Sequence, residues 1–201
     1  MRTLIESQYL PCLEYFSLIK NRETVWIETK EHFVKQTYRN RCYILGSDRI
    51  LPLAIPVIGG NKKIPMDEIK IDYGQKWLNN HWRAIISAYN KSPFFEFYEP
   101  YLHKILFKKH DTLLELNMEL LTFCLKVLNL DTEIKYTPTY EKVPFNETED
   151  IRSVIHPKSD YICREYFTPV PYQQLFGSKF ATNLSIIDLL SCIGPDANKY
   201  L

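Results

Sequence analysis

The stretch that decides the fold lies near the amino terminus, where residues 3–28 read TLIESQYLPCLEYFSLIKNRETVWIE. The apolar content of Thr3–Glu6 and Thr24–Glu28 predicts two short strands, and the residues between them predict a helix at about Cys12–Lys20. Pro11 suits the first turn of that helix, because its missing N–H would be unpaired there. A strand, a helix and a strand in this order predict a βαβ unit with parallel strands.

The loop after the first strand is the first candidate binding segment, and it contains Gln8 and Tyr9. In open α/β sheets, ligands bind beyond the carboxyl ends of the strands. We therefore expect both side chains to contact a ligand.

Two more β-rich runs, Tyr38–Leu45 and Ile50–Ile58, flank a turn-forming segment at residues 46–49. They predict a hairpin. Two prolines in the second run predict that it lies at a sheet edge or leaves the sheet early. A short strand is expected at Glu68–Asp72. The predicted fold class is α/β, with a mixed sheet that opens with the βαβ unit and a helical subdomain from about residue 75.

The first run of the hairpin contains a candidate anion site. Side chains alternate along a strand, so Arg39 and Arg41 are expected to face the same side. Two guanidinium groups on one face could hold one phosphate or carboxylate. Asn40, which lies between them, is a further candidate contact.

Asn79-Asn80-His81-Trp82-Arg83 is the densest group of functional side chains, and it lies where apolar spacing predicts that a helix begins. One interpretation is an N-terminal cap, a packed histidine and a solvated arginine. The other is a ligand site in which His81 is a general acid or base, because its ordinary pKa is ~6.5.

Helical geometry separates the members of this motif. At about 100° per residue, His81 falls within the apolar arc and Arg83 lies almost opposite. Either His81 belongs to the site together with Asn80 while Arg83 forms a bracing ion pair, or the helix begins later and the motif bends.

Two further helices are expected, at Asp111–Leu128 and from Ser185 to Ile193. Thr112 to Glu115 and Ser185 to Asp188 both have capping-box form. Gly194-Pro195 should end the second helix. Asp188 is therefore expected to be structural and not catalytic.

Residues 137–182 hold five prolines and little periodicity, which is typical of a functional loop, a lid or a poorly ordered region. His156 and Lys158 lie in this segment and could contact an anion, although a histidine beside a proline is also a common turn residue. We expect one domain over residues 1–201. Its parts are a β-rich, nucleotide-binding-like part at 1–74, a helical part at 75–130, an irregular loop region at 131–182 and a C-terminal helix at 183–201.

Composition excludes several classes of protein. Twenty-five basic and 24 acidic residues leave a formal charge of +1, which does not favour nonspecific nucleic-acid binding. The five cysteines form no CxxC pair, so neither a disulfide framework nor a metal site is expected. No apolar run reaches the ~20 residues of a membrane span. No signal peptide is recognisable at the amino terminus, and we expect a cytoplasmic protein with reduced cysteines.

Four ordered blocks give the chain a resemblance to the WbqC-like protein family. They are Gln8-Tyr9-Leu10-Pro11 with Tyr15-Phe16; Tyr38-Arg39-Asn40-Arg41; His81-Trp82-Arg83 with Ala88-Tyr89 and Pro93-Phe94-Phe95; and Asn183 to Leu190 with Gly194-Pro195. The resemblance implies work on a sugar or nucleotide-sugar in surface-polysaccharide (O-antigen) biosynthesis. It implies no settled reaction and no particular cofactor or oligomeric state.

Two functions are compatible with this resemblance. The first is an enzyme, a transferase or an amide-forming enzyme on amino-sugars, with His81 as the acid or base. The βαβ opening is similar in outline to nucleotidylyltransferases and pantoate ligases, but the histidine pair of their loop is missing here. The second is a noncatalytic sugar-binding or scaffold protein.

The scaffold hypothesis depends on a dense set of aromatic side chains, which could stack on sugars or could be core. They are Tyr89, Phe94, Phe95, Phe97, Tyr98 and Tyr101. An enzyme predicts a cleft where His81 meets Gln8, Tyr9, Arg39 or Arg41. A scaffold predicts a sealed His81 and exposed aromatic rings.

Overall fold

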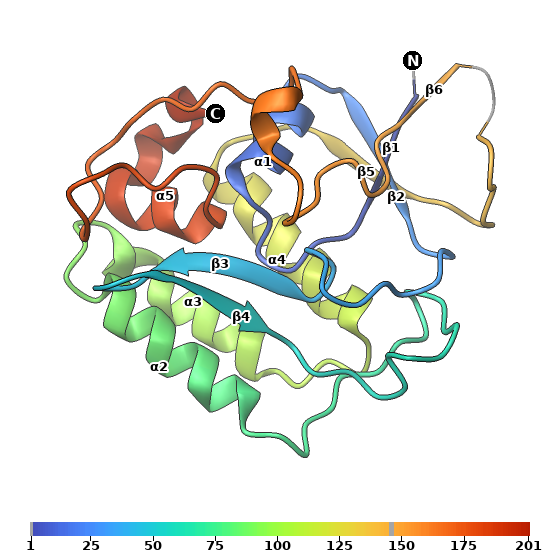
Figure 1. The fold of residues 1–201 in the computed structure, drawn as a ribbon, viewed down its shortest axis with the longest axis horizontal. Helices are drawn as coiled ribbons and strands as arrows, with labels where there is room; N and C mark the ends of the chain where they lie inside the picture. The colour runs from blue at the N-terminus through green and yellow to red at the C-terminus, as the bar shows by residue number, and fades with distance from the viewer. Residues whose placement is uncertain (1, 145–146) are drawn as a thin grey trace.

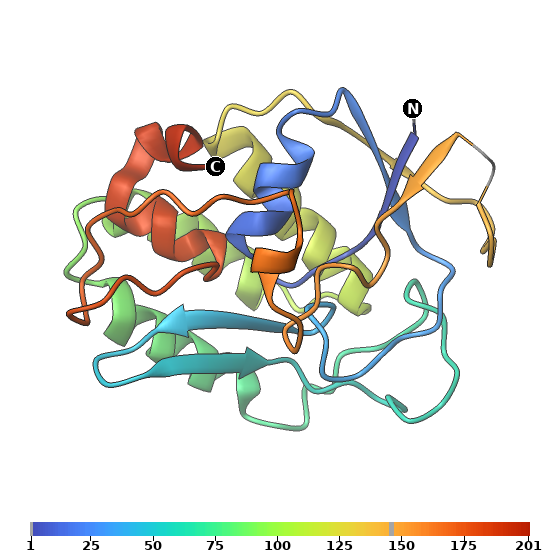
Figure 2. The same cartoon turned by 45° about the horizontal axis from the view of Figure 1, so that its top comes forward.

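A computed structural model describes residues 2–144 and 147–201. Its main sheet has four parallel strands in the order β5-β2-β1-β6. These strands are β1 (Arg2–Glu6), β2 (Thr24–Glu28), β5 (Glu133–Tyr136) and β6 (Thr148–Asp150). In both views this sheet and the C-terminal helix lie at opposite ends of the molecule (Figures 1 and 2).

The predicted βαβ unit is confirmed. Helix α1 (Leu13–Ile19) connects β1 to β2, and the two strands are parallel with Thr3 opposite Val25. Most of α1 is buried. This packing stabilises the helix, because a helix this short is only marginally stable on its own. The carboxyl ends of β1 and β2 therefore lie at one edge of the sheet.

The predicted hairpin also forms, but it makes a sheet of its own. Strands β3 (Arg41–Leu45) and β4 (Ile50–Ala54) are antiparallel. As the prolines predicted, the second run leaves the sheet early. The predicted start at Tyr38 is wrong, because residues 38–40 form a turn in which the Tyr38 carbonyl accepts a hydrogen bond from the Tyr9 N–H.

The strand predicted at residues 68–72 is absent from the described elements. Lys70 and Ile71 instead make isolated bridges to Thr112 and Val57. These single bridges hold the segment between the hairpin and the helices without building a ladder.

Three helices follow: α2 (Trp77–Tyr89), α3 (Phe95–Phe107) and α4 (Leu113–Val127). Helix α3 was not predicted, because Pro100 lies inside it and proline disfavours a helix interior. Its buried residues, Phe95, Leu102, Ile105 and Leu106, line one face, and that packing stabilises the helix. The capping box predicted for α4 is confirmed, with the Thr112 side chain accepting from the Glu115 N–H.

The C-terminal helix α5 (Ile186–Ile193) ends at Gly194 as predicted, and a 3-10 helix, η2 (Gly194–Tyr200), follows. Its predicted capping box is wrong: the Ser185 hydroxyl donates to the Leu10 carbonyl instead. The buried Asp188 carboxylate accepts hydrogen bonds from Tyr89, Tyr172 and Gln174. It therefore joins α5 to two distant segments.

Between residues 137 and 182 the described elements are β6 and a short 3-10 helix, η1 (Tyr161–Cys163). None of the helices in the described ranges is long and apolar enough to cross a membrane. Four cysteine side chains are buried free thiols, and that of Cys163 lies outside the described side chains. The four are Cys12, Cys42, Cys124 and Cys192.

Candidate functional site

Acidic side chains end two neighbouring strands of the parallel sheet. Glu6 is the last residue of β1 and Glu28 is the last residue of β2, and the strand register places them opposite each other. Both are buried. A buried carboxylate is costly unless it is paired and hydrogen-bonded, so the partners of these two groups define the chemistry of this edge.

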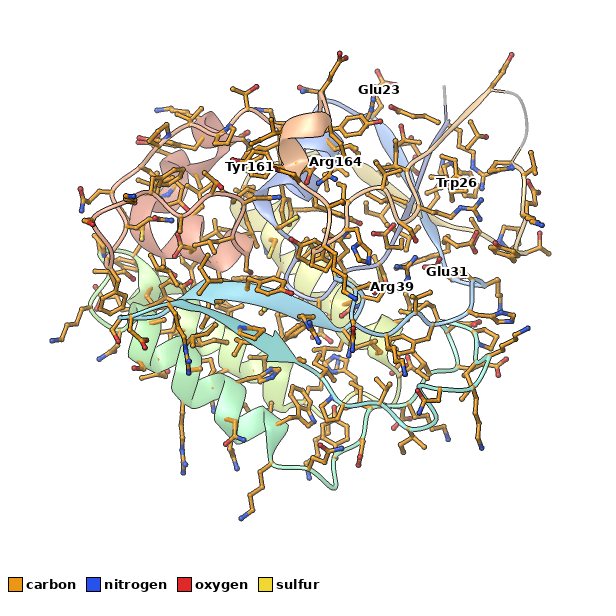
Figure 3. All side chains as sticks on the ribbon, in the orientation of Figure 1. Glu23, Trp26, Glu31, Arg39, Tyr161 and Arg164 are labelled. Atoms are coloured by element: carbon orange, nitrogen blue, oxygen red, sulfur yellow. The ribbon has the colours of Figure 1, made fainter. Side chains whose placement is uncertain are left out.

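Glu6, its partners Gln8 and Ser153, and the Arg39–Glu31 pair that contacts Ser153 form what we call the carboxyl-edge cluster. The Glu6 carboxylate accepts hydrogen bonds of 2.8 Å from Gln8 Nε2 and of 2.8 Å from the Ser153 N–H. Arg39 donates to both oxygens of Glu31, at 2.7 and 2.6 Å, and to Ser153 Oγ at 3.0 Å. The hydrogen bonds of Ser153 therefore bring distant segments together, and Figure 3 shows Glu31 and Arg39 next to each other.

The charges of the cluster are held away from water. The Arg39 residue is only 1% exposed. Burial acts to lower the pKa of Arg39, but the carboxylates of Glu6 and Glu31 outweigh that effect, and the pKa is raised. Burial raises the pKa of Glu31, and the Arg39 guanidinium opposes this rise only in part. The cluster thus contains a charged guanidinium that pairs with Glu31 and is also stabilised by the charge of Glu6.

Ser153, which follows β6, has a strained backbone. Its φ is 63°, in the left-handed region that non-glycine residues seldom adopt. Such strain persists where surrounding contacts impose it, and it is frequent at functional sites. Here the contacts are the hydrogen bonds to Glu6 and Arg39. Ser153 is also exposed, so it connects the buried charges to the surface.

Two buried amide oxygens near the cluster have no hydrogen-bond partner among the described residues: Gln8 Oε1 and Asn117 Oδ1. Their orientation is fixed, because Gln8 Nε2 must donate to Glu6 and Asn117 Nδ2 must donate to the Arg39 carbonyl at 2.8 Å. An unsatisfied buried acceptor costs about 1–3 kcal/mol. These oxygens are therefore unused hydrogen-bond acceptors beside the cluster.

A second network surrounds Glu28. Its carboxylate accepts from the Thr137 hydroxyl at 2.7 Å, the Lys30 N–H at 2.9 Å and Arg152 Nη1 at 2.9 Å. Arg152 also forms a bidentate pair with Asp150, and this hydrogen bonding is the main reason that its pKa is raised. The network ties the ends of β2, β5 and β6 together beside the carboxyl-edge cluster.

His81 lies apart from these charges, packed between aromatic side chains of α2 and the β1–α1 loop. Its Nδ1 is 3.1 Å from the Tyr9 hydroxyl, and its ring centroid is 5.1 Å from that of Trp77. It is 5% exposed, and burial lowers its pKa to about 4. The imidazole is therefore neutral at pH 7 and fixes the position of Tyr9.

The other polar residues of α2 do not share the surroundings of His81. Asn80 and Arg83 are both exposed. The expected grouping of Asn80 with His81 is therefore wrong, because neighbouring residues of a helix point in different directions. The ion pair expected for Arg83 is also absent among the described residues.

The predicted pairing of Arg39 with Arg41 on one strand face is wrong. Arg39 precedes β3 and lies in a turn, where the alternation of a strand does not apply. Arg41 is half-buried, and its Nε has no partner among the described residues. Asn40 holds the turn together by donating from Nδ2 to the Ile55 carbonyl at 2.8 Å.

His156 and Lys158 lie on the loop after Ser153, at the rim of the cluster. His156 Nδ1 accepts a hydrogen bond of 3.1 Å from the Lys158 N–H, and Lys158 Nζ donates to the Gln36 side chain at 3.2 Å. Burial, followed by the charges of Lys158 and Arg39, lowers the pKa of His156. The charge of Arg39 acts on His156, so this loop lies near the cluster.

Sequence reasoning found Gln8 and Arg39 but missed most of their partners. Glu6 and Glu28 carried a usable signal, since each ends an apolar strand at the edge where ligands bind. Glu31 and Ser153 lie in irregular segments and carried none. In the described ranges, no group of three His, Cys, Asp or Glu side chains could hold a metal ion.

Comparison with known proteins gives two matches. A family model described as "WbqC-like protein family" matches residues 6–157, which include the whole carboxyl-edge cluster. The chain is also 26% identical, over 224 residues, to a protein of Mycobacterium tuberculosis named "Uncharacterized protein Rv1507c". That similarity covers 98% of this chain and 96% of the relative. No solved structure matches the chain.

Proposed function

Because this chain belongs to the WbqC-like protein family, we propose that it binds a sugar or nucleotide-sugar of surface-polysaccharide (O-antigen) biosynthesis in the carboxyl-edge cluster. The family resemblance suggests the class of ligand. The observation that carries the location is the meeting of buried Glu6, Gln8 and Arg39 at the carboxyl end of β1. That is the edge where open α/β sheets bind ligands.

The chemistry of the cluster fits a ligand rich in hydroxyl groups. Sugar hydroxyls donate hydrogen bonds, and Gln8 Oε1 is a buried acceptor that has no partner among the described residues. The charged guanidinium of Arg39 donates a hydrogen bond to the hydroxyl of Ser153, which is an exposed residue. Lys158 at the rim adds positive charge for an anionic group such as a diphosphate, and the imidazole of His156, whose pKa is lowered, adds a neutral hydrogen-bonding group.

A transferase reaction is the catalytic form of this proposal. Such a reaction needs a group that removes a proton from an acceptor hydroxyl or amine. The sequence suggested His81, but a pKa of about 4 makes its imidazole a weak base, and it serves better to position Tyr9. Glu31 is the stronger candidate, because burial raises its pKa and it lies in the cluster.

A noncatalytic sugar-binding or scaffold protein is the second candidate function. The observation that favours it is on α3, where Phe97 and Tyr101 are each 61% exposed and Tyr101 stacks on Phe123 at 6.2 Å. Other rings of the aromatic set, Tyr89 and Phe95, are core. Two exposed rings on one helix could hold the apolar face of a sugar.

A thermal-shift screen against nucleotides and nucleotide-sugars tests the proposal. A ligand at 100 times its Kd should stabilise the native state by about 2.7 kcal/mol. We expect Gln8→Met and Ser153→Ala to abolish the shift, and Gln173→Met, which changes an exposed glutamine outside the cluster, to retain it. Circular dichroism establishes that each variant is folded.

The same screen separates the two functions. A shift that survives Gln8→Met and Ser153→Ala but disappears in Phe97→Ala/Tyr101→Ala would assign binding to the α3 surface and contradict the carboxyl-edge site. For the ligand found, turnover by wild type and its loss in Glu31→Gln would support the transferase. Undiminished turnover by Glu31→Gln would exclude Glu31 as the base.

A further inference from the structure

A cavity of about 560 Å³ lies away from the carboxyl-edge cluster, toward the amino ends of the central strands. Arg2 begins β1 and Thr24 begins β2, whereas Glu6 and Glu28 end these strands. Figure 3 shows Glu23 and Trp26, two of the residues that line it. The others are Arg2, Asn21, Arg22, Thr24 and Lys135.

The indole of Trp26 holds two of the cations in this cavity. The Arg2 guanidinium carbon lies 4.0 Å from the ring centroid, and Lys135 Nζ lies 6.0 Å from it. Attraction between a cation and an aromatic face positions a charge without neutralising it. Trp26 therefore positions the Arg2 guanidinium without neutralising its charge.

The balance of charges singles out Arg2. Arg22 pairs with Glu149 at 2.8 Å and Lys135 pairs with Glu133 at 2.8 Å. Arg2, by contrast, makes no ion pair with any described residue. The Nε atoms of Arg2 and Arg22 are buried, and neither has a hydrogen-bond partner among the described residues.

We infer that this cavity binds the phosphate group of a phosphorylated small molecule, with Arg2 as the principal contact and Lys135 as the second. The lining residues include three cations and the carboxylate of Glu23. Because Glu149 and Glu133 pair with Arg22 and Lys135, Arg2 is the cation of the three that makes no ion pair with a described residue. Guanidinium groups present paired donors that match phosphate oxygens. A cavity of this volume lies within the range that holds small ligands and cofactors. This site does not depend on the function proposed for the carboxyl edge.

The test is an NMR titration with inorganic pyrophosphate at low ionic strength. It monitors the indole N–H resonances of the three tryptophans. Trp26→Phe identifies the Trp26 resonance. We expect a saturable shift of that resonance. Arg2→Met should raise the Kd at least tenfold, whereas Arg83→Met, which changes an exposed arginine of α2, should leave it within twofold. Added salt should weaken binding.

Two results would overturn the inference: no saturable shift of the Trp26 resonance in wild type, or an undiminished shift in a folded Arg2→Met variant. If Arg2→Met does not fold, Lys135→Met takes its place and must raise the Kd at least threefold. An unchanged Kd in Lys135→Met would then overturn the inference. The readout is local to Trp26, so failure here is distinguishable from failure of the carboxyl-edge site.

Discussion

Replacing Arg39 with methionine tests the energetic basis of the carboxyl-edge cluster. The guanidinium donates two hydrogen bonds to Glu31 and one to Ser153, and its side chain is 1% exposed. The variant leaves the buried carboxylates of Glu31 and Glu6 without their cation. Removing one partner of a buried ion pair typically costs 3–5 kcal/mol. We therefore expect Arg39→Met to lower the free energy of unfolding by about 4 kcal/mol at pH 7.

Urea denaturation of four proteins measures this effect: wild type, Arg39→Met, Glu31→Leu and the double variant. The double variant removes both charges, so it should recover at least half of the stability that Arg39→Met loses. Arg83→Met, a change at an exposed residue, should stay within about 0.5 kcal/mol of wild type. A loss below about 1 kcal/mol in Arg39→Met, or additive losses in the double variant, would refute the reasoning.

Three further outcomes follow from the contacts. His81 has a folded pKa of about 4, below its unfolded value of ~6.5. The stability it contributes is therefore present above pH ~6.5 and is lost as the pH falls toward 4, by up to about 3 kcal/mol, and His81→Phe should flatten urea-measured stability in that window. Gly194→Ala should reduce the free energy of unfolding by about 1–3 kcal/mol and so lower the melting temperature, because φ is 66° and a Cβ would lie 2.4 Å from the Phe94 ring. Thr112→Ala should cost about 1 kcal/mol in urea denaturation through loss of the α4 cap, and no loss would contradict that role.

The elements that were predicted correctly from the sequence are those indicated by local residue patterns. Strands β1 and β2 carry buried apolar residues over short runs, and α1 lies between them in the expected order. The end of α5 was predictable because glycine adopts the positive φ that stops a helix there. Such signals depend on residues that are neighbours in the chain.

The elements that sequence missed depend on tertiary contacts. Helix α3 contains Pro100, and only packing of its apolar face overrides that signal. Asp188 fits the capping-box pattern, but two tyrosine hydroxyls and a glutamine amide reach its carboxylate instead. The local capping pattern therefore identified Asp188 as a structural residue but did not predict its hydrogen-bond partners.

Sequence reasoning predicted individual residues of the candidate site but not the contacts between them. The position of Gln8 after a strand followed from the βαβ order, and Arg39 was recognised as a cation. Its partner Glu31 and the contact between Glu6 and Ser153, which are 147 residues apart, need the folded chain. The pairing of Arg39 with Arg41 failed because the strand begins after Arg39.

The measurement that most directly tests the carboxyl-edge site is calorimetric titration of the best nucleotide-sugar from the screen into wild type and Gln8→Met. The account predicts one saturable site per chain in wild type and a Kd at least tenfold higher in the folded variant. An equal Kd in both proteins would contradict it.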